Sequence, residues 1–259
     1  MRREQYQTLK NWKEKKNKKP MIIFGARQVG KTYLVQEFAK DNYEYFYTIN
    51  FEFEKEALDI FSGNLDIKTL LIQLSSYQPN VPIIEGKTLI FFDEVQKCPQ
   101  VLTALKSFAL DGRFDVIASG SMLGIIMHEV SSYPVGYVET MHMKPMSFKE
   151  FLWANGYVDE QIETYKEYFL EQKPLPDGLH HTLNKYFLYY VVVGGMPEAV
   201  RTFVQTSNIH DVVVVQKRII ADYENDIAKY ASKAMKEKAR ECFKSIPDQL
   251  AKDNKKFQY

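Results

Sequence analysis

Short apolar runs alternate with segments of helical spacing over the first part of the chain. In the helical segments, apolar side chains recur three and four positions apart, as in residues 67–74. This alternation predicts an α/β fold in which a mainly parallel sheet is flanked by helices. Runs that suit strands lie at residues 21–24, 43–53, 89–92, 114–118 and 137–143.

From residue 146 onward the pattern changes to helix after helix. Ser147 followed by Glu150 is typical of a capping box that begins a helix, and Gly194 with Gly195 interrupts a later one. Four consecutive valines from Val212 would suit a strand, but the wider apolar spacing favours a helix there. We therefore expect an α/β domain at residues 1–145 and an all-helical region at 146–259.

The first strand leads into the sequence GARQVGKT, residues 25–32, which has the spacing of a P-loop. Glycines let consecutive backbone N–H groups form a nest at the N-terminus of the next helix, where phosphate binds. Lys31 would contact the β- and γ-phosphates, and the Thr32 hydroxyl would be a ligand of Mg²⁺. The motif thus predicts the core of a P-loop NTPase. The expected nucleotide-binding residues are Gly25, Ala26, Arg27, Gln28, Val29, Gly30, Lys31, Thr32 and Tyr33.

Two carboxylates, Asp93 and Glu94, follow the apolar strand at residues 89–92. In open α/β sheets, ligands bind beyond the carboxyl ends of the strands, so both residues are expected beside the phosphate loop. Asp93 would hold Mg²⁺, and Glu94 would activate the attacking water. A kinase does not need a water-activating glutamate here, so the pair favours hydrolysis.

Ser119 and Ser121 follow the next predicted strand. Ser119 is the first choice for a sensor residue that contacts the γ-phosphate or the water, and Ser121 is the second. A turn of small residues that caps the next helix explains either serine equally well.

Residues 1–20 have apolar side chains at Tyr6, Leu9 and Trp12 and a lysine-rich run up to Pro20. They predict an amphipathic helix and a basic turn. We favour a solvated segment that leads into the first strand. The alternative is that Arg2, Arg3 or the aromatic side chains contact the nucleotide base.

Composition narrows the class of protein. The chain has 259 residues, 45% of them hydrophobic, with a net charge of +1. It has no signal-like or membrane-spanning apolar run, and two distant cysteines, Cys98 and Cys242, fit a reducing compartment, so we expect a cytoplasmic protein. Nucleic-acid binding is weakly supported, because the lysine-rich segments also carry acidic residues.

Taken together, six stretches resemble the prokaryotic AAA-type ATPases in which an ATP-binding domain precedes a C-terminal domain of unknown function. They are GARQVGKT, LIFFDEVQ, ASGS, KPMSFKEF, GGMPEAV and IPDQLAKDNKKF. The resemblance implies ATP and Mg²⁺ as ligands and supports the roles of Lys31, Thr32, Asp93, Glu94 and a serine at 119–121.

The chain departs from this family in two respects. Tyr137 stands where a basic residue is expected, so an arginine supplied to a neighbouring subunit is in doubt, and Arg113, Arg201 or Arg218 would have to replace it. Family members also usually extend beyond a point such as Tyr259, which implies a chain truncated within its C-terminal domain.

Two functions follow as hypotheses. The first is Mg²⁺-dependent ATP hydrolysis with water activated by Glu94. A homo-oligomer is compatible with this function. The second is an ATP-dependent switch with slow or no hydrolysis, whose helical region engages an unknown protein or nucleic-acid partner.

Overall fold

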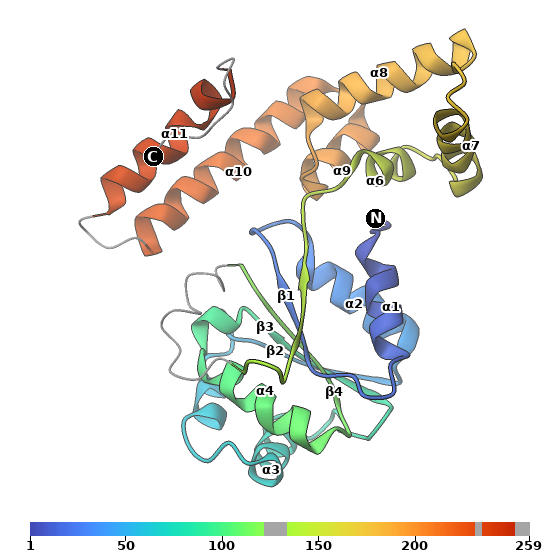
Figure 1. The fold of residues 1–259 in the computed structure, drawn as a ribbon. Coiled ribbons are helices and arrows are strands. Elements are labelled where there is room, and N and C mark those ends of the chain that lie inside the picture. Colours follow the sequence, from blue (N-terminus) through green and yellow to red (C-terminus); the bar gives the residue numbers. More distant parts are fainter. Residues whose placement is uncertain (122–133, 231–234, 252–259) are drawn as a thin grey trace. The chain divides into compact units, whose positions relative to one another are not determined.

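The computed structural model describes residues 1–121, 134–230 and 235–251. They divide into two compact units, one that ends at Pro197 and one that begins at Glu198. Figure 1 shows the elements, which are α1 (Gln5–Lys13), β1 (Met21–Phe24), α2 (Lys31–Asn42), β2 (Tyr45–Asn50), η1 (Lys55–Phe61), α3 (Ile67–Tyr77), β3 (Thr88–Asp93), η2 (Val95–Lys97), α4 (Gln100–Asp111), β4 (Asp115–Gly120), β5 (Glu139–His142), α6 (Phe148–Ala154), α7 (Asp159–Leu170), α8 (Asp177–Val193), α9 (Pro197–Thr206), α10 (Ile209–Tyr230) and α11 (Lys236–Ala251).

The five described strands form one parallel sheet in the order β2-β3-β4-β1-β5. Each predicted strand is present, and the helices that connect them pack on both faces. The expected α/β fold with a parallel sheet, followed by helices, is therefore confirmed. Because all strands run in the same direction, the loops after β1, β3 and β4 meet at one edge of the sheet.

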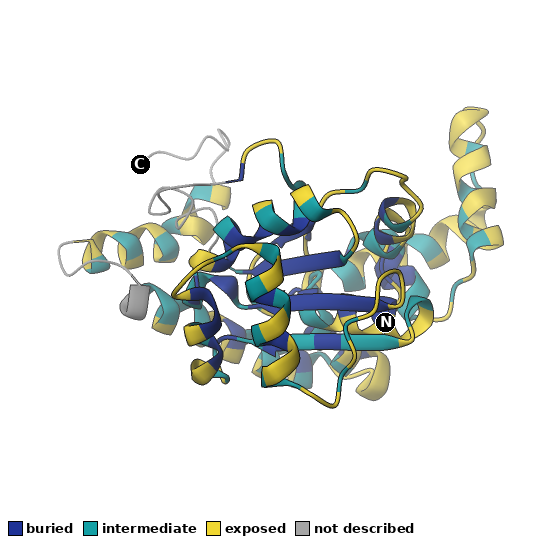
Figure 2. Cartoon of the chain, turned by 90° about the horizontal axis from the view of Figure 1, so that it is seen from below, coloured by how far each residue is buried: buried dark blue, intermediate teal, exposed yellow. Residues whose placement is uncertain are grey.

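Alternate side chains of the strands enter two separate hydrophobic cores. Ile22 and Phe24 of β1 face the core that holds α3 and α4, whereas Met21 and Ile23 face α1 and α2. Every residue of β1, β3 and β4 is buried, and Figure 2 shows dark blue strands among helices whose exposed surfaces are yellow. Burial on both faces explains why the strands read as continuous apolar runs.

The N-terminal helix is part of the core. Leu9 and Trp12 are buried against α2, and the Trp12 indole donates to the Lys19 carbonyl oxygen at 2.8 Å. The prediction of a solvated lead-in is therefore wrong. The apolar residues three positions apart form a stripe that covers one face of α2.

The helical elements after β5 begin and end near the predicted residues. Ser147 and Glu150 form the capping box of α6, and α8 ends before Gly194. The valines at 212–215 lie within helix α10, as the wider spacing predicts. The domain boundary expected after residue 145 stays a prediction.

Candidate nucleotide-binding site

The loop between β1 and α2 contains two residues with left-handed backbone conformation. Gln28 has a φ of 65° and Gly30 has a φ of 93°, and Val29 between them is fully buried. A Cβ at Gly25 would lie 2.4 Å from the Met143 carbonyl oxygen, so glycine is required where the loop leaves the sheet. Left-handed residues within a turn bring successive N–H groups into one concavity, which is the geometry of an anion nest.

Lys31 begins helix α2 and is buried. Its ammonium group donates to the carbonyl oxygens of Gly25 and Ala26, at 2.9 and 2.8 Å. Burial lowers the pKa of Lys31, and the charges of Glu94 and Asp93 oppose this effect. The cation is thus bound inside the loop, close to two carboxylates that favour its charged form.

Asp93, at the end of β3, is 2% exposed and accepts hydrogen bonds from several elements. One carboxylate oxygen accepts from the Thr32 hydroxyl at 2.8 Å and from the Asn50 amide at 3.2 Å. The other accepts from the Glu94 N–H at 3.0 Å and from the Ser119 hydroxyl. Donors from α2, β2 and β4 therefore hold this carboxylate at the edge of the sheet.

Asn50 was not predicted from the sequence. It is the last residue of β2 and lies directly opposite Asp93 in the ladder between β2 and β3. The only signal in the sequence is a polar residue at the end of a predicted strand. Asn50 reaches Asp93 only because the register of β2 and β3 places the two residues opposite each other.

Glu94 has a φ of 56° and is followed by the short helix η2. The Gln96 amide donates to its carboxylate and also lies 3.3 Å from the Ser121 hydroxyl. Burial and the charge of Asp93 raise the pKa of Glu94, whereas the Gln96 hydrogen bond lowers it. Glu94 is thus a partly buried carboxylate whose proton affinity depends on its neighbours.

The two serines expected as sensors have different surroundings. Ser119 is fully buried, and its hydroxyl donates to Asp93. Ser121 is partly buried and contacts Gln96, the residue that binds Glu94. Ser119 therefore contacts Asp93, the residue expected to hold the metal. Ser121 is linked through Gln96 to Glu94, the residue expected to activate water.

The oxygens of Thr32 and Asp93 suit a magnesium ion. The two lie 2.8 Å apart at the mouth of the loop, and both are hard oxygen donors of the kind that Mg²⁺ prefers. Within the described ranges, no group of three or more His, Cys, Asp or Glu side chains could hold a metal. The residues therefore fit a Mg²⁺ ion that also takes phosphate oxygens and water.

A cavity of about 720 Å³ is lined by residues of the N-terminal segment, of α2 and of the helices α6 and α7. Tyr33, which follows Thr32, lines it together with the aromatic rings of Tyr6 and Trp153. The Arg2 guanidinium lies 4.0 Å from the centre of the Trp153 ring. The wall thus combines aromatic faces with charged groups of both signs. Its remaining lining residues are Met1, Arg3, Glu4, Gln7, Leu34, Glu37, Asp41, Lys149, Asp159 and Glu163.

The arginines considered as replacements for a missing catalytic arginine include two with nearby acidic partners. Arg113 pairs with Asp111 at 2.8 Å, and Arg218 pairs with Glu198. The Lys106 ammonium lies over the ring of Tyr137, 5.1 Å from the centre of that ring.

Comparison with protein families agrees with this geometry. A family model described as an AAA domain matches residues 17–152, which is more than half of the chain. A second model, described as a domain of unknown function (DUF8612), matches residues 184–259. The first match contains the phosphate loop and both carboxylates.

Individual relatives are more distant. The uncharacterized protein MJ1544 of Methanocaldococcus jannaschii is 26% identical over 211 residues, which are 80% of this chain and 40% of that protein. The chain therefore spans less than half the length of this relative.

Solved structures are similar at the level of the fold. The Walker-type ATPase PABY2304 of Pyrococcus abyssi aligns with a TM-score of 0.50 and 15% identity, over 96% of this chain and 77% of that one. PCH-2 of C. elegans aligns with a TM-score of 0.42 and 13% identity, over 77% of this chain and 60% of that one.

No helix in the part of the chain that the structure describes combines the length and hydropathy needed to cross a bilayer.

Proposed function

Since this chain belongs to the AAA domain family of P-loop ATPases, which implies ATP binding, we propose that it hydrolyses Mg²⁺-bound ATP. The observation that carries the proposal is the hydrogen bond of 2.8 Å between Thr32 and Asp93. It joins the phosphate loop to the acidic end of β3, where an NTPase needs its metal.

In the proposed complex, the loop amides and Lys31 bind the phosphates. The Lys31 ammonium exchanges the carbonyl oxygens of Gly25 and Ala26 for β- and γ-phosphate oxygens. Thr32 and Asp93 hold Mg²⁺, which neutralises charge on the phosphate oxygens when it is bound. Each of these groups stabilises negative charge on the triphosphate.

Glu94 supplies the base in this mechanism. It accepts a proton from the attacking water, whose oxygen bonds to the γ-phosphorus while the bond to the bridging oxygen of ADP breaks. The Gln96 amide must release or reorient the Glu94 carboxylate for this step, because it binds that carboxylate directly. The raised pKa of Glu94 makes it a better base than an exposed carboxylate.

We further propose that the nucleotide base lies in the cavity lined by Tyr33 and Trp153. The cavity begins one residue after Thr32, and its aromatic walls suit a flat heterocycle. The chain has only two tryptophans, and Trp12 is buried in the core. Binding of ATP should therefore change the fluorescence of Trp153 alone.

The test of hydrolysis is phosphate release with saturating ATP and Mg²⁺. Glu94→Gln should lower the rate by about 10²-fold or more and leave ATP binding within a few-fold. Glu44→Gln is the matched control, because Glu44 pairs with Lys87 beyond the opposite end of β2. Equal rates in wild type and Glu94→Gln would remove Glu94 from the mechanism.

The test of the base site is a fluorescence titration. Wild type should respond to ATP, and Trp153→Phe, which retains Trp12, should give no response while it still binds ATP by calorimetry. A response that persists in Trp153→Phe would place the base elsewhere.

A nucleotide-dependent switch with slow hydrolysis is the second candidate function. The hydrogen bond from Gln96 to Glu94 favours it, because it holds the base in a fixed orientation. Tight ATP binding by calorimetry, with phosphate release no faster than in a sample without protein, would select the switch over the hydrolase.

A further inference from the structure

Arg3 is a buried charged side chain beside the phosphate loop. It is 6% exposed, although it lies near the N-terminus, and each of its three guanidinium nitrogens donates a hydrogen bond. Nε donates to the Glu150 carboxylate at 2.9 Å, and the terminal nitrogens donate to the carbonyl oxygens of Val29 and Lys144, both at 2.6 Å. The fork of one side chain thus joins the phosphate loop to the segment after β5.

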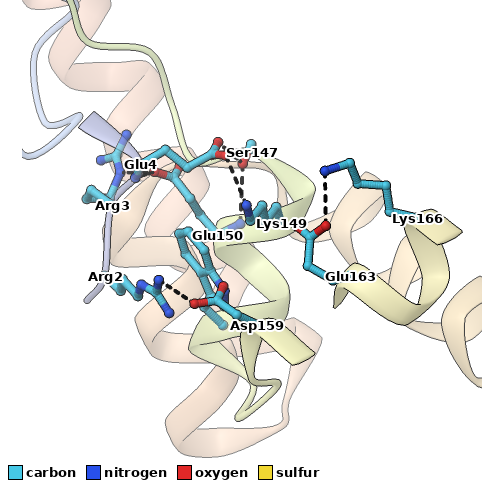
Figure 3. Close-up of polar contacts among 10 residues, drawn as sticks. Arg2, Arg3, Glu4, Ser147, Lys149, Glu150, Asp159, Glu163 and Lys166 are labelled. Atoms are coloured by element: carbon cyan, nitrogen blue, oxygen red, sulfur yellow. Dashed lines mark hydrogen bonds and ion pairs between the residues drawn. The ribbon is translucent and has the colours of Figure 1, made fainter. Parts of the chain in front are cut away.

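Glu150 balances this charge and is itself held on several sides. It is 1% exposed, and it accepts from the backbone N–H groups of Glu4 and Ser147 at 2.7 and 2.9 Å. Figure 3 shows Arg3, Glu4, Ser147 and Glu150 gathered at the start of α6. Because its partners are built into a helix cap, the carboxylate fixes where the guanidinium lies.

The contact with Val29 bears on the phosphate nest through the geometry of the peptide bond. The described chain contains no cis peptide, so the C=O of Val29 and the N–H of Gly30 point in opposite directions within one plane. A guanidinium that holds the Val29 oxygen therefore turns the Gly30 N–H away from itself. An added Cβ at Gly30 would lie 3.6 Å from Arg3 Nη1, which places the cation directly against this peptide.

We propose that Arg3, held by Glu150, is a positioning residue that orients the Val29–Gly30 peptide so that its N–H faces bound phosphate. This inference rests on the proposed function, since it assumes that the loop binds a triphosphate. Arg3 acts on the ligand through the loop backbone. It lies on the outer side of that peptide, bonded to a carbonyl that would repel phosphate if it turned inward.

An effect of Arg3 on phosphate binding can be separated from an effect on binding of the base. Arg3 also lines the cavity proposed for the base, so a loss of ATP affinity alone would be ambiguous. Inorganic tripolyphosphate with Mg²⁺ carries the phosphates without a base. If Arg3 positions the loop, its substitution weakens ATP and tripolyphosphate by the same factor.

The experiment measures the dissociation constants of both ligands for Arg3→Lys. Lysine keeps the charge beside Glu150 but lacks the planar fork that reaches two carbonyl oxygens at once. We expect both ligands to bind Arg3→Lys about tenfold more weakly than they bind wild type. Arg240→Lys is the control, because it makes the same replacement at an exposed residue of α11, in the other unit, and both ligands should bind it within twofold of wild type.

A second variant covers the case in which Arg3→Lys does not fold. Arg3→Gln combined with Glu150→Gln replaces the ion pair by two amides, so that no buried charge lacks a partner. Glutamine is too short to reach the Val29 oxygen, and the same loss for both ligands is expected. Circular dichroism and the urea midpoint report whether each variant is folded.

The outcomes separate this inference from the proposed function. A folded variant at Arg3 that binds both ligands within twofold of wild type would overturn the inference, and so would a loss for ATP that is absent for tripolyphosphate. If wild type binds neither ligand, the proposed function itself fails.

Discussion

At the scale of single residues, the site depends on carboxylates whose neighbours set their behaviour. Asp93 accepts from a threonine, an asparagine, a serine and a backbone N–H, so its orientation is fixed before any ligand binds. Glu94, one residue later, has an amide partner and a raised pKa. Adjacent carboxylates thus differ, because the first is held by four hydrogen bonds whereas burial and the charge of Asp93 raise the pKa of the second.

The pH dependence of hydrolysis should report Glu94. Its raised pKa means that it loses its proton at a higher pH than an exposed glutamate, so the rate should fall on acidification through that higher pKa. Gln96→Leu removes the hydrogen bond that lowers the pKa, and the acid limb of the pH–rate profile should move to higher pH. Gln161→Leu in α7 is the control. An acid limb that does not move in Gln96→Leu would separate this limb from Glu94.

At the scale of elements, close backbone contacts join the strands to the segments that follow them. The loop after β1 passes against Met143, and Gly195 after α8 packs against Met146. The Met146 N–H donates to the Gly195 carbonyl oxygen at 2.6 Å. These contacts keep the segment after β5 close to the loop and to the end of α8.

A pair of glycine substitutions tests this packing. A Cβ at Gly195 would lie 2.3 Å from the Met146 carbonyl oxygen, so Gly195→Ala should reduce the free energy of unfolding by about 1–3 kcal/mol. Gly178 lies in α8 with nothing within 4 Å of an added Cβ, and Gly178→Ala should stabilise by about 0.5 kcal/mol. Urea denaturation measures both. A Gly195→Ala protein as stable as wild type would show that Met146 can move aside.

At the scale of the whole molecule, the phosphate loop, both carboxylates and the cavity all lie in the unit Met1–Pro197. Any ligand that binds only the folded state stabilises it, and above the Kd the gain grows with the logarithm of the ligand concentration. Nucleotide binding should therefore stabilise this unit directly.

Stabilisation by ligand checks this assignment without an activity assay. At an ATP concentration 100 times its Kd, Mg²⁺-bound ATP should raise the free energy of unfolding by about 2.7 kcal/mol. Lys31→Ala should lose most of this increase, because it removes the buried cation within the loop. Glu94→Gln should retain it. An equal increase in wild type and Lys31→Ala would show that ATP binds away from the loop.

Local sequence patterns were sufficient to predict where the strands, most helices, the loop after β1 and the two carboxylates lie in the chain. Each depends on neighbours within a few positions: continuous apolar runs for buried strands, spaced glycines for the loop, and acidic residues directly after β3. The position of Asp93 near Thr32 also followed, because parallel strands place their carboxyl ends at the same edge.

The positions of Asn50 and Arg3 depend on contacts between distant parts of the chain. Asn50 meets Asp93 across 43 positions through the register of β2 and β3, and Arg3 meets Glu150 across 147 positions. A single polar residue has no periodic signature, so the pattern of residues 1–20 suggested a solvated segment. Arg3 is buried instead, because the hydrogen bonds that satisfy its charge come from segments that meet only in three dimensions.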